Sequence, residues 1–215
     1  MRTLTLVTQK GGAGKTTLAA SLAVAAAEAG ERVIALDLDP QGSLASWGDA
    51  RETDSPAVDR VGAAQIVKLP AILSALAAEG YTLAILDTAG VESTGGNLAM
   101  KAADMALIPA RPSRLDLQAT MPTIEALMRL EMRDRFAFVL NQCPPGRNTR
   151  SSEAAKGLAM FGILADPALT QRADHQDAVA AGQGVTEYAP EGKAAEEVRA
   201  LWQWIARKLK GQSDV

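Results

Sequence analysis

Short apolar runs alternate along the chain with longer segments in which apolar residues recur every three or four positions. The short runs end in polar or glycine-rich residues, a pattern that predicts β-strands joined by amphipathic helices. Strands are expected at residues 3–7, 32–37, 83–87, 106–109 and 136–141, with less regular ones near 60–63 and 162–164. Helices are expected at residues 15–29, 44–50, 69–79, 96–103, 116–132, 151–161 and 193–210.

This alternation of strands and helices is typical of an α/β fold built from βαβ units. We expect a doubly wound, mostly parallel sheet with helices on both faces. The chain has 215 residues and is 47% hydrophobic, enough for one well-buried core, so residues 1–215 are expected to form a single domain. In such sheets ligands bind beyond the carboxyl ends of the strands, which is where the polar residues of interest lie.

The sequence QKGGAGKTT at residues 9–17 follows the first predicted strand and opens the first predicted helix. Glycines in this setting let backbone N–H groups converge on phosphate oxygens at a helix N-terminus. Lys15 is expected to reach the outer phosphates, and Thr16 to ligate Mg²⁺. The residues expected to bind the nucleotide in this loop are Gly11, Gly12, Ala13, Gly14, Lys15, Thr16 and Thr17.

The loop departs from the general phosphate-binding pattern, because Gln9 replaces its first glycine and a second lysine, Lys10, precedes Gly11. The string KGGAGKTT resembles the deviant Walker A motif of the ParA and MinD ATPase family. This resemblance implies ATP or ADP with Mg²⁺ as the bound groups. It also implies a homodimer in which two ATP molecules are sandwiched and Lys10 contacts the phosphates of the other subunit.

Two carboxylates follow the second predicted strand in the string DLDPQ at residues 37–41. In the family, the position of Asp39 orients or deprotonates the attacking water, so Lys10, Lys15 and Asp39 are the residues expected to take part in catalysis. Asp37 is expected to support the metal in its outer shell or to fix the loop. Capping of the following helix remains an alternative for both aspartates.

Two further polar residues close predicted strands. Asp87 ends an apolar strand, which is the Walker B arrangement, and is expected to hold Mg²⁺ through water. Asn141 ends a later strand, and the resemblance implies that its side chain hydrogen-bonds adenine. Each could instead be an ordinary turn residue.

The formal net charge of −3 argues against a protein that coats nucleic acid by bulk electrostatics, so any DNA contact must be local. Candidate contacts are Arg147, Arg150, Arg172 and Arg207. The one cysteine, Cys143, cannot form an internal disulfide, and we expect a cytoplasmic, nucleoid-associated protein. The lone histidine, His175, lies among polar residues and reads as a surface residue without a role.

The resemblance extends over almost the whole chain and is strongest to the short ParA type, such as ParF-like plasmid-partition proteins, with a VirC-like relative also possible. It implies a slow ATPase whose ATP-bound dimer binds DNA non-specifically. A centromere-binding or adaptor protein of the ParB or ParG kind is then expected to stimulate hydrolysis and release the DNA.

Two other functions stay open. A MinD-like membrane-positioning ATPase would use the apolar stripe Val198, Leu201, Trp202, Ile205 and Leu209 as an interfacial helix. The same spacing is explained by packing on the sheet, and Trp204 falls off the stripe, so no stable membrane association is expected. A small-substrate P-loop enzyme, like the dethiobiotin synthetase relatives, shares the expected fold but not both motifs.

Overall fold

The structure, a computed structural model, describes residues 1–91, 93–146 and 148–211. Its described strands form one seven-stranded sheet in the order β3-β2-β4-β1-β5-β6-β7. Each pairing between neighbours in this sheet is parallel. The strands are β1 (Arg2–Leu6), β2 (Val33–Asp37), β3 (Ala57–Arg60), β4 (Leu83–Asp87), β5 (Met105–Ala110), β6 (Phe136–Leu140) and β7 (Ile163–Leu164).

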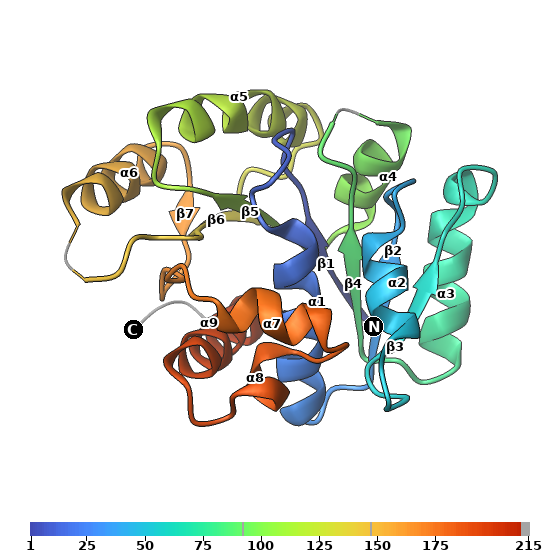
Figure 1. Cartoon of the computed structure of the whole chain (residues 1–215). Helices are drawn as coiled ribbons and strands as arrows, with labels where there is room; N and C mark the ends of the chain where they lie inside the picture. Colours follow the sequence, from blue (N-terminus) through green and yellow to red (C-terminus); the bar gives the residue numbers. More distant parts are fainter. Residues whose placement is uncertain (92, 147, 212–215) are drawn as a thin grey trace.

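Helices cover both faces of the sheet (Figure 1). On one face lie α1 (Lys15–Glu28), α2 (Ser43–Asp49), α7 (Asp174–Ala180), α8 (Val185–Tyr188) and α9 (Lys193–Leu209). On the other lie a 3₁₀ turn η1 (Ile66–Lys68), α3 (Leu69–Ala78), α4 (Thr94–Ala102), α5 (Arg114–Arg129) and α6 (Thr149–Ala159). The chain therefore has the predicted doubly wound α/β fold, with a sheet that is parallel throughout its described pairings.

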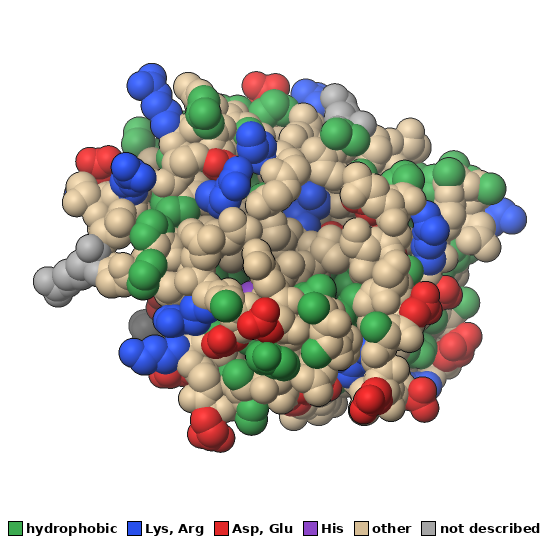
Figure 2. Space-filling model, in the orientation of Figure 1, with side chains coloured by type: hydrophobic (Ala, Val, Ile, Leu, Met, Phe, Trp, Pro, Cys, Tyr) green, Lys and Arg blue, Asp and Glu red, His purple; other side chains and the backbone are tan. Residues whose placement is uncertain are grey.

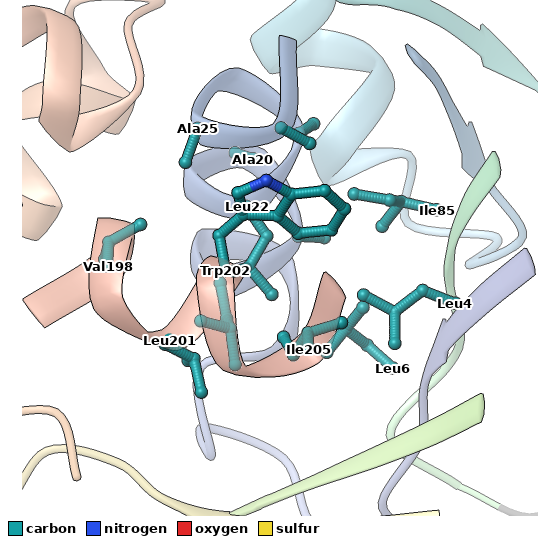
Figure 3. Packing of buried hydrophobic residues seen from close by; sticks show 14 of the residues in the cluster. Leu4, Leu6, Ala20, Leu22, Ala25, Ile85, Val198, Leu201, Trp202 and Ile205 are labelled. Carbon is teal, nitrogen blue, oxygen red and sulfur yellow. The ribbon is translucent and has the colours of Figure 1, made fainter. Parts of the chain in front are cut away.

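The central contact of the first face is the packing of α9 on α1 over β1 (Figure 3). Helix α1 is rich in alanine, so another helix can approach it closely, and Trp202 of α9 fills the space beside it. Leu4 and Leu6 alternate with Thr3 and Thr5 along β1 and point their apolar side chains into this layer. The C-terminal apolar stripe is thus part of the core.

Trp204 is also buried, although the helical spacing places it off the stripe. The face of α9 that is covered by the rest of the protein is wider than an every-third-or-fourth pattern indicates.

The second face has two apolar clusters that share the sheet. One packs α5 and α6 on β5 and β6, and the other packs η1 and α3 on β2 and β4. Helix α4 contributes to both, through Met100 to the first and Ala99 to the second. Residues of one strand alternate between faces, so Ala106 and Ile108 face α5 while Leu107 faces α1.

The predicted element order is correct, but several boundaries differ. Strand β3 lies at Ala57–Arg60 rather than near 60–63, because its partner β2 ends at Asp37, opposite Arg60. Helices α4, α5 and α6 begin two residues earlier than predicted, since the side chains of Ser93, Ser113 and Asn148 cap their first turns. The short elements η1, α7 and α8 were not predicted.

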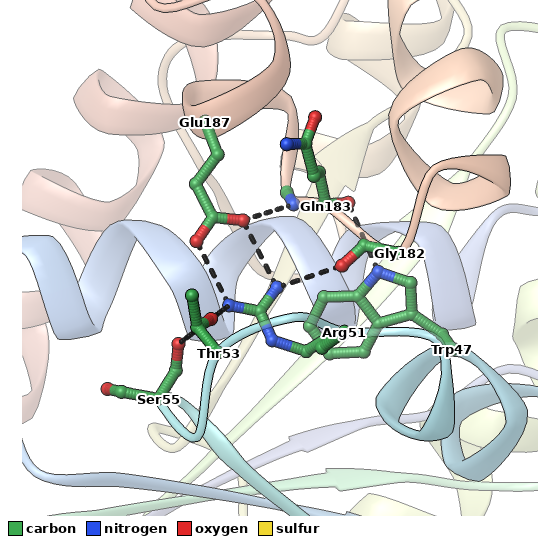
Figure 4. Close-up of polar contacts among 8 residues, drawn as sticks. Trp47, Arg51, Thr53, Ser55, Gly182, Gln183 and Glu187 are labelled. Atoms are coloured by element: carbon green, nitrogen blue, oxygen red, sulfur yellow. Dashed lines mark hydrogen bonds and ion pairs between the residues drawn. The ribbon is translucent and has the colours of Figure 1, made fainter.

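Arg51, just after α2, links the end of this helix to α8 and to the turn between α7 and α8 (Figure 4). Its guanidinium donates to both carboxylate oxygens of Glu187 at 2.9 and 3.1 Å and to the Gly182 carbonyl at 3.2 Å. It also lies over the Trp47 ring, 4.8 Å from the centroid. Only 2% of the Arg51 side chain is exposed, and both terminal nitrogens of its guanidinium pair with the Glu187 carboxylate, although the buried Nε has no hydrogen-bond partner.

The same junction relies on a close backbone approach. Gly182 has φ 69, and a Cβ there would lie 2.3 Å from the Ala50 carbonyl oxygen. The Trp47 indole N–H donates to the Gln183 carbonyl at 3.1 Å, beside this contact. The end of α2 and the turn between α7 and α8 therefore touch through backbone as well as side chains.

We predict that Arg51→Ala lowers the free energy of unfolding by about 3 kcal/mol, because it leaves the Glu187 carboxylate without its buried partner. Urea denaturation measures the change. Arg207→Ala, at an exposed position on α9, is the matched control and should leave the midpoint unchanged. Equal midpoints for the two variants would show that the Arg51 network adds nothing to stability.

Candidate functional site

The carboxyl ends of three adjacent strands meet at one edge of the sheet. In the strand register, Asp87 of β4 is opposite Asp37 of β2 on one side and Leu6 of β1 on the other. The loops that follow these strands border a cleft of about 630 Å³. It is lined by Gly11, Gly12, Gly14, Lys15, Thr16, Thr17, Asp39, Pro40, Gln41, Ser43, Ala89, Gly90, Val91 and Ser93.

The glycine-rich loop joins β1 to α1, and two of its glycines adopt conformations that other residues resist. Gly12 has φ 76 and Gly14 has φ 86, both left-handed. A Cβ on Gly14 would lie 2.5 Å from the Asn141 side-chain nitrogen, so a larger residue there would displace the loop after β6. The predicted loop residues Gly11, Gly12, Ala13, Gly14, Lys15, Thr16 and Thr17 thus form one continuous turn into the helix.

Thr16 and Asp87 are in direct contact at the base of the cleft. The Thr16 hydroxyl donates a 2.6 Å hydrogen bond to Asp87 Oδ2. Burial raises the pKa of Asp87 to about 7, against the opposing effect of the Thr16 hydrogen bond and the Lys15 charge, while Asp37 and Asp39 raise it further. Its other oxygen, Oδ1, is buried and accepts no hydrogen bond. This carboxylate therefore needs positive charge that the described side chains only partly supply.

A hydrated divalent cation fits this need. The donor set consists of a threonine hydroxyl and a carboxylate oxygen, which are the hard oxygen ligands that Mg²⁺ takes alongside phosphate oxygens. Among the described residues, no group of three or more His, Cys, Asp or Glu side chains could enclose a metal ion. Thr16 and Asp87 would thus hold Mg²⁺ together with a bound phosphate. The ion would offset the negative charges of the Asp87 carboxylate and the phosphate.

Lys15 is buried at the opening turn of α1, with 8% of its surface exposed. Burial lowers its pKa, while attraction to Asp87 and Asp39 counteracts this. Gly90, after β4, lies so close that a Cβ there would be 3.3 Å from Lys15 Nζ. The ammonium is therefore confined between two loops and directed to the cleft that both border.

Asp37 and Asp39 differ in their partners. Asp37 is fully buried, and its two oxygens accept hydrogen bonds from the backbone N–H groups of Asp39 and Ala45, each at 2.9 Å. It fixes the loop and caps α2, which supports the loop-geometry and capping alternatives; an outer-shell metal role stays a prediction. Asp39 Oδ1 accepts from Gln41 N–H, and its partly exposed side chain lines the cleft; its role in positioning water stays a prediction.

Asn141 holds the phosphate-binding loop from the side. Its amide nitrogen donates to the Ala13 carbonyl at 2.8 Å, and its oxygen accepts from Gln142 N–H at 2.9 Å. Gln142 donates in turn to the Gly12 carbonyl. The hydrogen bond to adenine remains a prediction, and a loop-fixing role, which the sequence did not indicate, is present in the structure.

Asn141 also lines a second, narrower pocket beside the loop. Its walls are Gly14, Thr17, Leu18 and Ser21 of α1 and its start, Asn141 and Gln142, and a segment formed by Leu169, Thr170, Gln171, Arg172, His175 and Gln176. His175 is partly buried here, so its assignment as a plain surface residue was wrong. Gly14, Thr17 and Asn141 were predicted from the sequence, but Ser21 and His175 belong to no motif, because only the return of the chain after β7 brings His175 to α1.

The four arginines predicted to contact DNA lie in different environments. Arg150 and Arg207 are exposed. Arg172 is partly buried in the second pocket and forms an ion pair with Glu197 at 2.8 Å, which also accepts from Thr170. Arg147 lies outside the described residues. Lys10 is half-buried beside the glycine loop, and its cross-subunit role stays a prediction.

Comparison with known proteins agrees with this geometry. Residues 4–176 match the CobQ/CobB/MinD/ParA nucleotide binding domain. The chain is 32% identical over 211 residues to the maintenance of carboxysome distribution protein A of Gloeobacter kilaueensis, covering 97% of this chain and 94% of the relative. It is also 32% identical over 158 residues to protein virC1 of Rhizobium radiobacter, covering 70% and 68% of the two chains.

The fold has close counterparts among solved structures. The septum site-determining protein MinD from Pyrococcus horikoshii, complexed with Mg-ADP, superposes with a TM-score of 0.75 at 22% identity, covering 100% of this chain and 99% of that one. The matched domain includes the glycine loop, both aspartate-bearing strand ends and the loop after β6. The chain therefore belongs to the CobQ/CobB/MinD/ParA nucleotide-binding family, in which its relatives are ParA-type partition and positioning ATPases.

Proposed function

We propose that this protein is an ATP-dependent DNA-partition or positioning ATPase that works as a nucleotide-sandwich homodimer. The observation that carries the proposal is the cleft in which Lys15, Thr16 and Asp87 converge behind a loop that holds a second lysine, Lys10. The first three residues suit a Mg²⁺-bound triphosphate. Lys10 is half-buried beside the loop, and the resemblance of KGGAGKTT to the deviant Walker A motif is what favours a role for it across a dimer.

In this scheme Lys15 neutralises the outer phosphates, and Asp39 positions the attacking water at the open side of the cleft. The Asp39 carboxylate accepts a hydrogen bond from the backbone N–H of Gln41. Slow intrinsic hydrolysis is part of this proposal, because a DNA-bound state must persist until a partner triggers release. A partner protein of the ParB or ParG kind stimulates hydrolysis, and the ADP-bound protein then leaves DNA.

DNA binding relies on exposed basic residues contributed by both protomers, because affinity for a phosphate backbone rises with each neutralised phosphate. Arg150 and Arg207 are available for this, whereas the ion pair with Glu197 makes Arg172 unsuitable. Figure 2 shows that most Lys and Arg side chains on this face lie in its upper half and along its left margin, with most Asp and Glu in the lower half. The basic side chains in this view are scattered, with some Asp and Glu between them, so we propose that both protomers of the dimer contribute to DNA binding.

A membrane-positioning function is not favoured. The apolar stripe needed for an interfacial helix is buried against α1, with Val198, Leu201 and Ile205 fully covered. Within residues 1–91, 93–146 and 148–211, no helix combines the length and apolar character that a bilayer crossing demands. Detaching α9 would expose the core of the first face.

We predict that Lys10→Ala retains ATP binding but stays monomeric in ATP and Mg²⁺, because the lost charge acts on the partner's nucleotide. Calorimetry measures the affinity, and sedimentation velocity the oligomeric state. Lys15→Ala is the matched control and should lose ATP binding itself. An ATP-dependent dimer of normal stability in Lys10→Ala would refute the sandwich.

Asp39→Ala is expected to bind ATP and dimerise while hydrolysis falls on the order of 100-fold, the usual contribution of a general base or water-positioning group. Phosphate release in single-turnover conditions reports the rate. Asp59→Ala, an exposed carboxylate on β3, serves as the control. Hydrolysis at the normal rate in Asp39→Ala would remove this residue from the mechanism.

The double variant Arg150→Ala, Arg207→Ala should weaken ATP-dependent DNA binding several-fold and flatten its salt dependence, with a slope change of roughly one for each phosphate contact removed. The measurement is fluorescence anisotropy of an unrelated-sequence duplex over a range of salt. Lys68→Ala, exposed on η1, is the control. Identical salt slopes in the unmodified protein, the double variant and the control would mean that Arg150 and Arg207 do not contact DNA.

A further inference from the structure

Three buried polar atoms without hydrogen-bond partners belong to residues that line one pocket. They are Ser21 Oγ, Arg172 Nε and His175 Nε2. Buried polar groups are nearly always satisfied, so such a concentration indicates that the pocket receives a polar ligand or ordered water. Ser21 is the clearest case, because its side chain is 1% exposed and its hydroxyl has no partner.

The position of the pocket narrows the choice of ligand. Thr17 and Ser21, one helical turn apart on the same face of α1, both line it. Ser21 lies about 6 Å further along the helix axis than Thr17. A nucleotide with its phosphates on the glycine loop therefore has its sugar near Thr17, and the base extends toward Ser21 and His175.

The chemistry of the pocket suits a heterocyclic base. Burial lowers the pKa of His175, with Arg172 acting in the same direction and Glu197 and Asp174 opposing it. A neutral imidazole offers one donor and one acceptor, and a serine hydroxyl can do either. Leu18 and Leu169 supply apolar surface beside these groups, as is usual in sites for small molecules.

We propose that Ser21 and His175 are specificity-determining residues that hydrogen-bond the base of the bound nucleotide. The inference rests on the proposed function, because it takes the triphosphate on the glycine loop as given. It assigns a role to a serine inside α1 and to the single histidine of the chain. Arg172 completes the wall, and its ion pair with Glu197 holds it in place.

The test compares ATP with tripolyphosphate, each with Mg²⁺, by isothermal titration calorimetry. Tripolyphosphate offers the phosphate contacts but no base. Ser21→Ala and His175→Ala should each weaken ATP binding about fivefold, the effect of one hydrogen bond, and leave tripolyphosphate binding unchanged. His175→Gln, whose amide nitrogen reaches a similar position, should recover part of the loss. Asp177→Ala, exposed on the same helix and outside the pocket, is the control.

The outcomes separate the two proposals. Failure of the unmodified protein to bind either ligand would refute the nucleotide site and with it the proposed function. If that protein binds both, unchanged ATP affinity in Ser21→Ala and His175→Ala would overturn the base-recognition role alone. Equal losses for ATP and tripolyphosphate would also overturn it, because they would mean that the substitutions only disturb the loop. Thermal denaturation of each variant verifies that it is folded.

Discussion

The contact between Thr16 and the buried Asp87 carboxylate is the constraint on which the nucleotide cleft depends. It joins the first turn of α1 to the end of β4, and so fixes the glycine loop against the strand that carries the second acidic motif. Because β4 pairs in parallel with both β1 and β2, the loops after all three strands begin at the same edge of the sheet as this contact. The carboxylate stays incompletely satisfied, which suits it to a cation.

A second set of contacts supports the loop from the opposite side. Asn141 and Gln142 donate to the carbonyls of Ala13 and Gly12, and thereby link the glycine turn to the end of β6. The phosphate cleft and the narrower pocket share Gly14 and Thr17, so the loop forms a common wall. The phosphates and the base of a nucleotide would therefore be positioned by the same loop.

The fold and the phosphate site were predictable because their signals are local. The string at residues 9–17 and the aspartates at strand ends are contiguous, and the strand pattern places them at one edge. The pocket containing His175 was not predictable, since it needs the chain after β7 to return to α1. Arg172 looked like a surface cation because its partner, Glu197, lies on a distant helix. The starts of α4 and α5 were predicted two residues too late, because the capping side chains of Ser93 and Ser113, and not apolar residues, set them.

The Arg51 network has a mechanical consequence for a protein that changes ligand. Asp37 accepts a hydrogen bond from Ala45 N–H in the first turn of α2. Arg51, at the far end of that helix, donates to Gly182 between α7 and α8 and to Glu187 of α8. Helix α7 carries His175. Helix α2 therefore connects the loop after β2, which contains Asp39, to the wall of the narrower pocket. A shift at one end must be transmitted to the other or break a buried ion pair.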